Sequence, residues 1–139
     1  MGCVSLSFTI DKIFVNLAVK DLARSLAFFR AMGLTFNEQF TNEQAAAMVI
    51  SDHIYAMLLT EEYFRTFTKK EIADATRTTE VLVALHAASR AEVDLLVDKA
   101  VAAGGTIYAE PVDHGFMYVR TFADLDGHQW EIFHMQMDQ

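Results

Sequence analysis

The sequence predicts an α+β fold made of two βαβββ modules that together form a cup, a mixed and partly open sheet with helices outside. Strand-like and helix-like segments follow one another in the same order twice along the chain. Each predicted helix also stops at glycine, Gly33 in one case and Gly104-Gly105 in the other. A chain of 139 residues is long enough for one buried core. We therefore expect a single domain, at residues 11–139, after a poorly ordered start at 1–10.

The first module is predicted at about residues 11–60. Residues 12–19 are rich in branched and aromatic side chains, which is typical of a strand. Asp21 can cap a helix that reaches Met32, because apolar residues recur there at helical spacing. Gly33 ends this helix, since glycine adopts the left-handed C-cap conformation at little cost. Three short apolar stretches then predict a meander of strands, at 34–41, 45–51 and 53–60.

A helical connection is predicted at residues 61–78, lying over the rim of the cup. Thr68 and Glu71 have the spacing of a capping box for a short helix within it. The second module follows at about residues 79–137, and Ser89 with Glu92 forms another capping box. Its remaining elements are predicted as strands at 80–86, 106–110, 116–122 and 128–135 around a helix that ends at Gly104.

The charge of the chain argues against two kinds of partner, and its cysteine content indicates a compartment. The formal net charge is −8, with 19 acidic against 11 basic residues. Nucleic acids and anionic membrane surfaces require clustered Lys and Arg, so neither is expected as a partner. Cys3 is the single cysteine, which favours a reducing, cytoplasmic compartment.

Motifs near both ends of the chain carry a family resemblance. The stretch Val19-Lys20-Asp21-Leu22-Ala23-Arg24-Ser25-Leu26-Ala27-Phe28-Phe29, followed by Met32-Gly33-Leu34, closely resembles the strand-to-helix opening of the vicinal-oxygen-chelate superfamily. The stretch Asp124-Leu125-Asp126-Gly127-His128-Gln129-Trp130-Glu131-Ile132 resembles its closing strand. That superfamily contains glyoxalase I, extradiol dioxygenases, and fosfomycin and bleomycin resistance proteins. In detail the chain is most similar to small bacterial proteins described as predicted lactoylglutathione lyases.

The resemblance implies a divalent-metal site whose ligands come from four strands. Glu131 stands at the position of the closing-strand ligand, and Glu80 is a possible oxygen ligand where a histidine is usual. Phe14 and Met57 stand where the family has two further ligands. Two carboxylates hold Mg²⁺ or Mn²⁺ only weakly and make a poor Zn²⁺ or Ni²⁺ cage. We therefore expect that the protein holds no resident metal. If a divalent ion is bound, we expect Glu80 and Glu131 to be its ligands.

Asp126-Gly127 is a favoured dipeptide for a two-residue type I′ hairpin turn. Such a turn places Phe122 opposite Glu131 and Arg120 diagonally on the same face. We therefore expect Glu131, the candidate catalytic base, to face the cup and to form an ion pair with Arg120.

Strand alternation selects the side chains that should line the cup. The expected ligand-binding residues are Phe14, Asn16, Met57, Phe116, Tyr118 and Arg120. None of the histidines occurs at a compact metal-ligand spacing, so we interpret them as packing or surface residues: His53, His86, His114, His128 and His134.

These observations predict a protein that binds a small amphiphilic or aromatic molecule in its cup. One alternative is a metal-dependent lyase or isomerase of the glyoxalase I kind, or an extradiol dioxygenase-like enzyme, with an atypical ligand set. A second alternative is a resistance protein that only sequesters its ligand. The resemblance also implies a homodimer.

Overall fold

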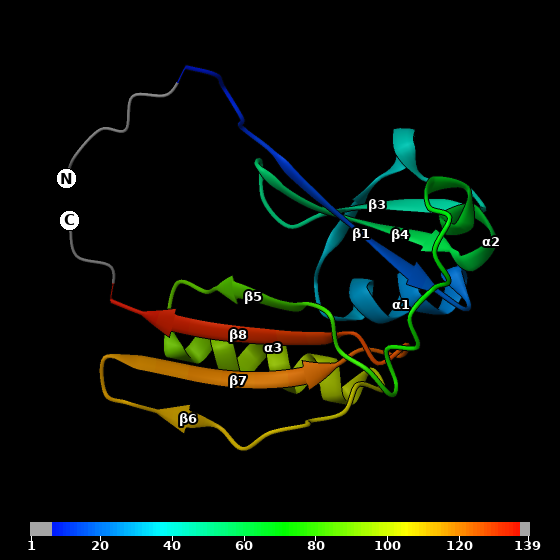
Figure 1. The fold of residues 1–139 in the computed structure, drawn as a ribbon. Helices are drawn as coiled ribbons and strands as arrows, with labels where there is room; N and C mark the ends of the chain where they lie inside the picture. Colours follow the sequence, from blue (N-terminus) through cyan, green and yellow to red (C-terminus); the bar gives the residue numbers. More distant parts are fainter. Residues whose placement is uncertain (1–6, 137–139) are drawn as a thin grey trace.

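The computed structural model describes residues 7–136 and contains two separate four-stranded sheets (Figure 1). The strand order is β1-β4-β3-β2 in the first sheet and β5-β8-β7-β6 in the second, so the two modules repeat one topology. In each sheet the first strand runs parallel to the last, and the other pairs are antiparallel. The predicted α+β fold with two βαβββ modules is confirmed. Of the predicted poorly ordered start, only residues 7–10 lie within the described part.

The first module follows the predicted order with one shortened strand. Asp21 caps the first helix by accepting a hydrogen bond of 3.1 Å from the Arg24 amide, and Gly33 ends it with φ +101°. The side chain of Asn37 accepts from the Gln39 amide, which turns the chain into a 3-10 helix and stops the second strand early. The elements are β1 (Ile13–Val19), α1 (Leu22–Ala31), β2 (Thr35–Asn37), η1 (Glu38–Phe40), β3 (Ala45–Val49) and β4 (Ile54–Thr60).

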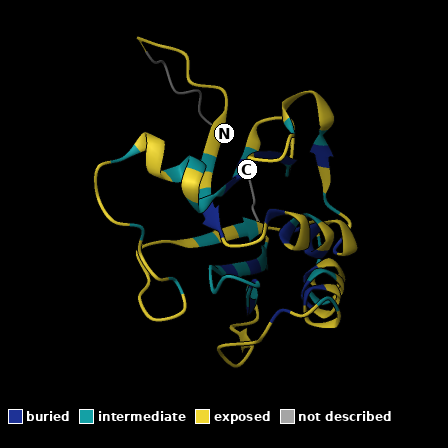
Figure 2. Cartoon of the chain, turned by 90° about the vertical axis from the view of Figure 1, so that its right-hand side faces the viewer, coloured by how far each residue is buried: buried dark blue, intermediate teal, exposed yellow. Residues whose placement is uncertain are grey.

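The connection between the modules is helical only at its beginning. It contains α2 (Glu61–Phe64) and η2 (Arg65–Phe67) and then runs without regular structure to the second sheet. The helix predicted from Thr68 and Glu71 is therefore absent. The Thr68 hydroxyl instead accepts from the Lys70 amide at 3.1 Å, which forms a local turn that competes with a helix. The segment is mostly exposed and loops out beside the sheets (Figure 2).

The second module contains β5 (Leu82–His86), α3 (Arg90–Ala102), β6 (Val112–Asp113), β7 (Met117–Ala123) and β8 (Gln129–Met135). The strand predicted at 106–110 is reduced to a single bridge between Thr106 and Ala123. Pro111, which has no N–H to donate to a sheet, follows this stretch, and the pairing resumes only at Val112.

One aromatic core joins the two modules. Phe29 of α1 packs against Trp130 of β8 with ring centroids 5.5 Å apart, and Phe122 of β7 stacks on the same indole at 6.1 Å. All three side chains are almost completely buried. α1 packs on β3 and β4, and α3 packs on β7 and β8. We call the opposite faces of the two sheets the cup. Within residues 7–136, none of the helices has the length and apolar character needed to cross a membrane.

Candidate functional site

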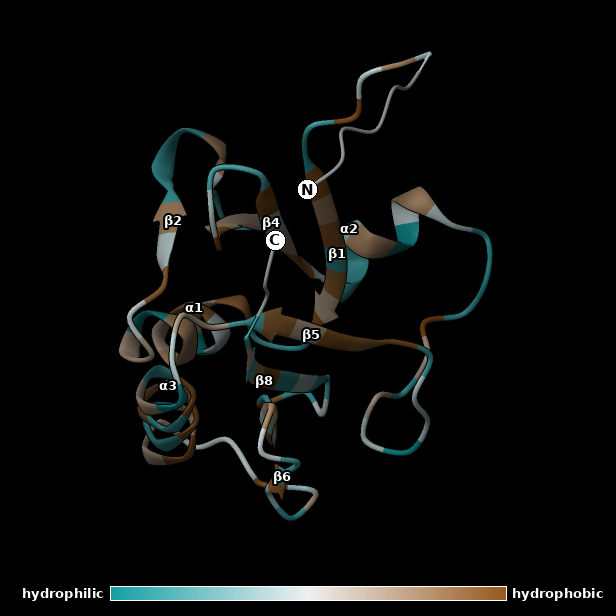
Figure 3. Ribbon diagram, turned by 90° about the vertical axis from the view of Figure 1, so that its left-hand side faces the viewer, coloured by the Kyte–Doolittle hydropathy of each residue, from teal (hydrophilic) through white to brown (hydrophobic). Residues whose placement is uncertain are grey.

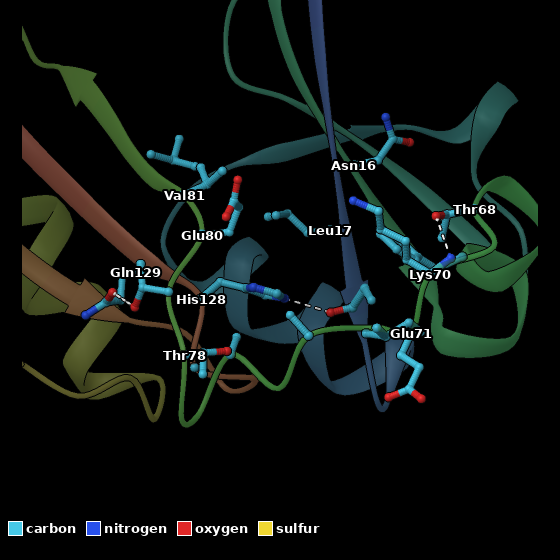
Figure 4. Close-up of a pocket in the computed structure, with 18 residues that line it drawn as sticks. Asn16, Leu17, Thr68, Lys70, Glu71, Thr78, Glu80, Val81, His128 and Gln129 are labelled. Atoms are coloured by element: carbon cyan, nitrogen blue, oxygen red, sulfur yellow. Dashed lines mark hydrogen bonds between the residues drawn. The ribbon is translucent and has the colours of Figure 1, made fainter.

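A pocket of about 340 Å³ lies between β1, the connection and the beginning of β8 (Figure 4). Its apolar wall includes Leu17, Ile72, Val81 and Val83. Polar side chains line it as well, from β1, the connection and β8. Apolar walls combined with directed polar groups are typical of sites for small molecules.

The connection is held over the pocket by a close backbone contact. Gly127 has φ +90°, and a Cβ there would lie only 2.8 Å from the carbonyl oxygen of Ala75. The Thr79 hydroxyl also hydrogen bonds to the side-chain oxygen of Gln129 at 2.5 Å. Glycine at position 127 thus lets the connection approach the β7–β8 loop closely enough to wall off the pocket.

Three charged side chains line the pocket from the connection, Lys70, Glu71 and Glu80. In the close-up Lys70 and Glu80 lie on opposite sides of Leu17 (Figure 4). Asn16 lines the same space from β1, and its amide donates to the Phe14 carbonyl at 3.3 Å. Of the predicted site residues, the structure therefore brings Asn16 and Glu80 to one pocket.

His128 forms the floor between this pocket and a second, more polar one of about 390 Å³. Its Nε2 donates to the carbonyl oxygen of Ala18 at 2.7 Å, because a carbonyl can only accept. This bond ties the β7–β8 loop to the end of β1. The interpretation of His128 as a packing residue is thus incomplete, since the ring also lines both pockets.

Asp124 organises the loop that carries His128. Its carboxylate accepts from the amides of Asp126 and His128 and from the indole N–H of Trp130, each at 3.0 Å. Burial raises the pKa of Asp124, and the nearby His128 and these donors oppose that shift. Asp126 in turn accepts from the Lys20 amide at 2.9 Å, so the loop fastens the second module to the first.

The β7–β8 hairpin differs from the predicted register by one residue. Five residues, 124–128, separate the paired Ala123 and Gln129, and Glu131 lies opposite Thr121 instead of Phe122. Glycines are the only residues of the described chain with positive φ, so Asp126 cannot occupy a type I′ turn. A shift of one residue moves every side chain of a strand to the opposite face.

This shift overturns the predicted ion pair between Glu131 and Arg120. Arg120 lies opposite Ile132 on the helix-covered face, where its guanidinium binds Asp94 at 3.1 Å and Asp98 at 3.0 Å. The Tyr118 hydroxyl donates to Asp94 at 2.6 Å on the same face. Both side chains brace β7 against α3, away from the cup.

Glu131 does face the cup. It lies between Ala84 of β5 and Thr121 of β7 and is half-buried. The Tyr108 hydroxyl lies 3.5 Å from the carbonyl oxygen of Trp130, the residue before Glu131. Burial, and after it the charge of Glu131, raises the pKa of the Tyr108 phenol. Glu131 lines neither of the two pockets described above, so the candidate base and the pocket of Lys70 occupy different places.

The remaining predicted binding residues are spread over the cup. Phe14 stacks on Tyr55 with centroids 4.6 Å apart and is half exposed, and Met57 pairs with Asn16 across β1 and β4. Phe116 precedes β7 and is 65% exposed, with its ring near that of His114. Neither Phe14, Met57 nor Phe116 lines the pocket of Lys70.

The residues at the expected metal positions do not fit a metal centre. Phe14 and Met57 offer no oxygen or nitrogen ligand, and Glu131 has Ala84 and Thr121 as its strand neighbours. Glu80 precedes Ala84 by four residues, roughly 13 Å of extended chain, so the two carboxylates are separated along β5. Residues 7–136 contain no group of three or more His, Cys, Asp or Glu side chains that could hold an ion.

Sequence reasoning missed Lys70 as a site residue. The sequence predicts a helical connection at 61–78 with a capping box at Thr68 and Glu71, whereas the structure places Lys70 in an irregular stretch that lines the pocket. The available signal was the pair of adjacent lysines, Lys69-Lys70, but only the folded chain decides which of the two reaches the pocket.

Comparisons with solved structures agree with this architecture. A hypothetical protein from S. aureus is 29% identical, with a TM-score of 0.75 over 91% of this chain and 95% of that one. A glyoxalase/bleomycin resistance protein/dioxygenase family enzyme from Burkholderia phytofirmans is 18% identical, with a TM-score of 0.74 over 88% and 96%. The fosfomycin resistance protein FosX from Listeria monocytogenes is 18% identical, with a TM-score of 0.64 over 99% and 96%.

Comparison at the level of sequence is consistent with these folds. None of the curated proteins compared with the chain matches it. The sequence profile of the glyoxalase/bleomycin resistance protein/dioxygenase superfamily matches residues 9–132, which is nearly the whole chain. The predicted family resemblance is thereby confirmed, and the chain belongs to the glyoxalase/bleomycin resistance protein/dioxygenase superfamily.

Proposed function

We propose that the protein binds a small amphiphilic molecule in the pocket between β1, the connection and β8, without a resident metal. The observation that carries this proposal is the pocket of about 340 Å³, which combines an apolar wall with polar and charged side chains. Its volume lies within the range of sites for small organic ligands. The ligand's apolar part would lie on Leu17, Ile72 and Val83. Its polar part would contact Asn16 or the charged side chains of the connection.

A pocket-filling variant tests this proposal. Val81 lines the pocket and is 52% exposed, so Val81→Trp fills the space without disturbing the core. Val112 is 42% exposed on β6 and lies outside the pocket, which makes Val112→Trp a matched control. Fragments from an amphiphilic library that bind wild type should shift backbone NMR signals of Leu17 and Ile72. Val81→Trp should abolish binding and Val112→Trp should retain it.

Fragments that bind equally well to Val81→Trp would contradict the proposal. The same holds if the bound fragments shift only residues outside the pocket. A ligand that binds only after a divalent ion has been added would argue for the metal-dependent alternative.

We also propose that the protein forms a homodimer through the free edges of its sheets. β1 and β5 are both edge strands, and Ile13, Phe14 and Leu82 on them are at least half exposed. Figure 3 shows these two strands coloured mostly hydrophobic on one side of the molecule. A second copy that covered these strands would pair their unused backbone groups. Sedimentation equilibrium at micromolar concentration should give twice the chain mass of 15.6 kDa. A monomer would refute the proposal.

A cytoplasmic location remains an expectation from the single Cys3 of the sequence. Fractionation of cells that produce the tagged protein would test it.

A further inference from the structure

Lys70 and Glu80 are opposite charges that face one pocket without neutralising each other. Neither has an ion-pair partner within 4.0 Å among residues 7–136, although both line the same space. In Figure 4 the ammonium end of Lys70 and the carboxylate of Glu80 point toward the space around Leu17 from opposite sides. The pocket therefore has a positive side, a negative side and an apolar wall between them.

Of the other acidic groups near the pocket, two contact neighbouring residues and a third points away. Glu61 pairs with Arg65 at 3.8 Å on the rim, and Asp126 accepts from the Lys20 amide. Glu71 also lines the pocket, but its carboxylate points away from Lys70 and Glu80 (Figure 4). Lys70 and Glu80 are thus the pair whose charges are directed into the space that a ligand would fill.

Local structure fixes the backbone at both charged positions. The Thr68 hydroxyl accepts a hydrogen bond from the Lys70 amide, and this turn fixes the backbone from which the lysine side chain extends. The Thr79–Gln129 hydrogen bond anchors the residue before Glu80 to β8. The two charges are therefore carried by separate, locally fastened segments of the connection.

We propose that the pocket recognises a zwitterion, a molecule with a cationic and an anionic group joined by a short apolar body. This inference rests on the proposed function and specifies the ligand class of the same site. The anionic group would bind Lys70, the cationic group would bind Glu80, and the apolar body would lie on Leu17 and Val81. Both side chains are exposed, so each charged contact formed in this way should contribute about threefold in affinity.

The exposure of both side chains predicts a strong dependence on salt. Raising the ionic strength from about 0.01 M to about 1 M shortens the Debye length from roughly 30 Å to 3 Å. Binding of a zwitterion should weaken over this range, whereas binding driven by the apolar walls alone should not.

The test uses a series of ω-amino carboxylates, from 4-aminobutanoate to 8-aminooctanoate. Alkanoates and alkylamines of the same length serve as control ligands that carry only one of the two charges. Dissociation constants are measured by NMR titration of the purified full chain, following the amides of Leu17, Lys70 and Glu80. At least one ω-amino carboxylate should bind about threefold more tightly than either singly charged analogue of the same length.

Three variants assign the two charges. Lys70→Gln should reduce the affinity of the zwitterion to that of the alkylamine, and Glu80→Gln should reduce it to that of the alkanoate. Lys69 is the neighbouring lysine and does not line the pocket, so Lys69→Gln should leave the affinity unchanged. Circular dichroism confirms that each variant is folded.

The inference is overturned if no ω-amino carboxylate binds more tightly than its singly charged analogues, or if Lys69→Gln weakens binding as much as Lys70→Gln. If uncharged amphiphiles still shift Leu17 and Ile72 in that case, the proposed function survives and only the ligand class is wrong. If no fragment of any class maps to the pocket, both proposals fail.

Discussion

The backbone of Ala75 rests directly on Gly127, at a position where a Cβ would lie 2.8 Å from the Ala75 carbonyl oxygen. Through this contact the connection between the modules closes one side of the pocket. Gly127 also has φ +90°, a conformation that side-chain-bearing residues rarely adopt.

Replacing Gly127 with alanine should therefore combine two costs. The positive φ costs about 1 kcal/mol, and the steric overlap with the connection adds about 1–3 kcal/mol. Gly115 has φ +83° but no atom within 4 Å of its would-be Cβ, so Gly115→Ala carries only the first cost. Urea denaturation should show a clearly larger loss for Gly127→Ala. Equal losses would mean that the connection does not rest on this glycine.

Asp124→Asn should destabilise the protein by about 2 kcal/mol, because an amide cannot accept from all three N–H groups that now reach the carboxylate. Trp130 is the single tryptophan, so its indole N–H signal in NMR reports the loss of one of these bonds directly. An unchanged indole signal and midpoint would contradict this network.

The same carboxyl group predicts a pH dependence of stability. Its pKa in the folded state is raised from the usual 3.8, so between the two values the folded protein binds more protons than the unfolded chain. The contribution of Asp124 to the free energy of unfolding is therefore greatest below pH 3.8, and it is lost as the pH rises through the raised pKa of the folded state. Wild type should therefore lose stability relative to Asp124→Asn as the pH rises over this range. A relative gain of stability by wild type would contradict a raised pKa of Asp124.

Arg90→Met should raise the pKa of Asp113 toward its ordinary value of about 3.9. Arg90 donates to both carboxylate oxygens, at 2.9 and 2.7 Å, and this contact holds the pKa of Asp113 far below the usual range. Titration of the carboxyl carbon by NMR measures the change, with Arg24→Met as a control that removes an arginine from the opposite module. Both partners are exposed, so we expect little change in the midpoint of unfolding.

Glu131→Gln should lower the pKa of Tyr108 and leave it above the ordinary value. Burial is the larger cause of the raised pKa and persists in the variant, whereas the repulsive charge is removed. Glu110→Gln removes a nearby exposed carboxylate as a control. Elemental analysis of the same samples should give equal metal content in wild type and variant. Stoichiometric metal that disappears in Glu131→Gln would restore Glu131 as a ligand.

Arg120→Met should lower stability by about 1 kcal/mol without changing ligand binding. Its guanidinium is largely covered and joins β7 to two aspartates of α3, which are themselves half or more exposed. If this variant stays folded but binds the ligand more weakly, Arg120 is a ligand-binding residue after all.

Local signals determined most of the fold. Asp21 and Ser89 cap the two long helices as expected, accepting from the amides three residues later, and Gly33 and Gly104 end them with positive φ. Such caps depend only on neighbours along the chain, so the sequence contains all the information that they need. The order of elements and the family resemblance followed from these signals.

Tertiary contacts decided the face of β7 and the location of the pocket. Asp126-Gly127 alone favours a two-residue turn, but Asp124 engages the buried Trp130 indole and two amides, which lengthens the loop to five residues and reverses the face of Arg120. Likewise, Lys70 and Glu80 share a pocket because Ala75 packs on Gly127, some fifty residues away in the sequence. Local propensity determines helices and turns, whereas register and pockets arise from contacts between distant segments, and no periodicity in the sequence encodes those contacts.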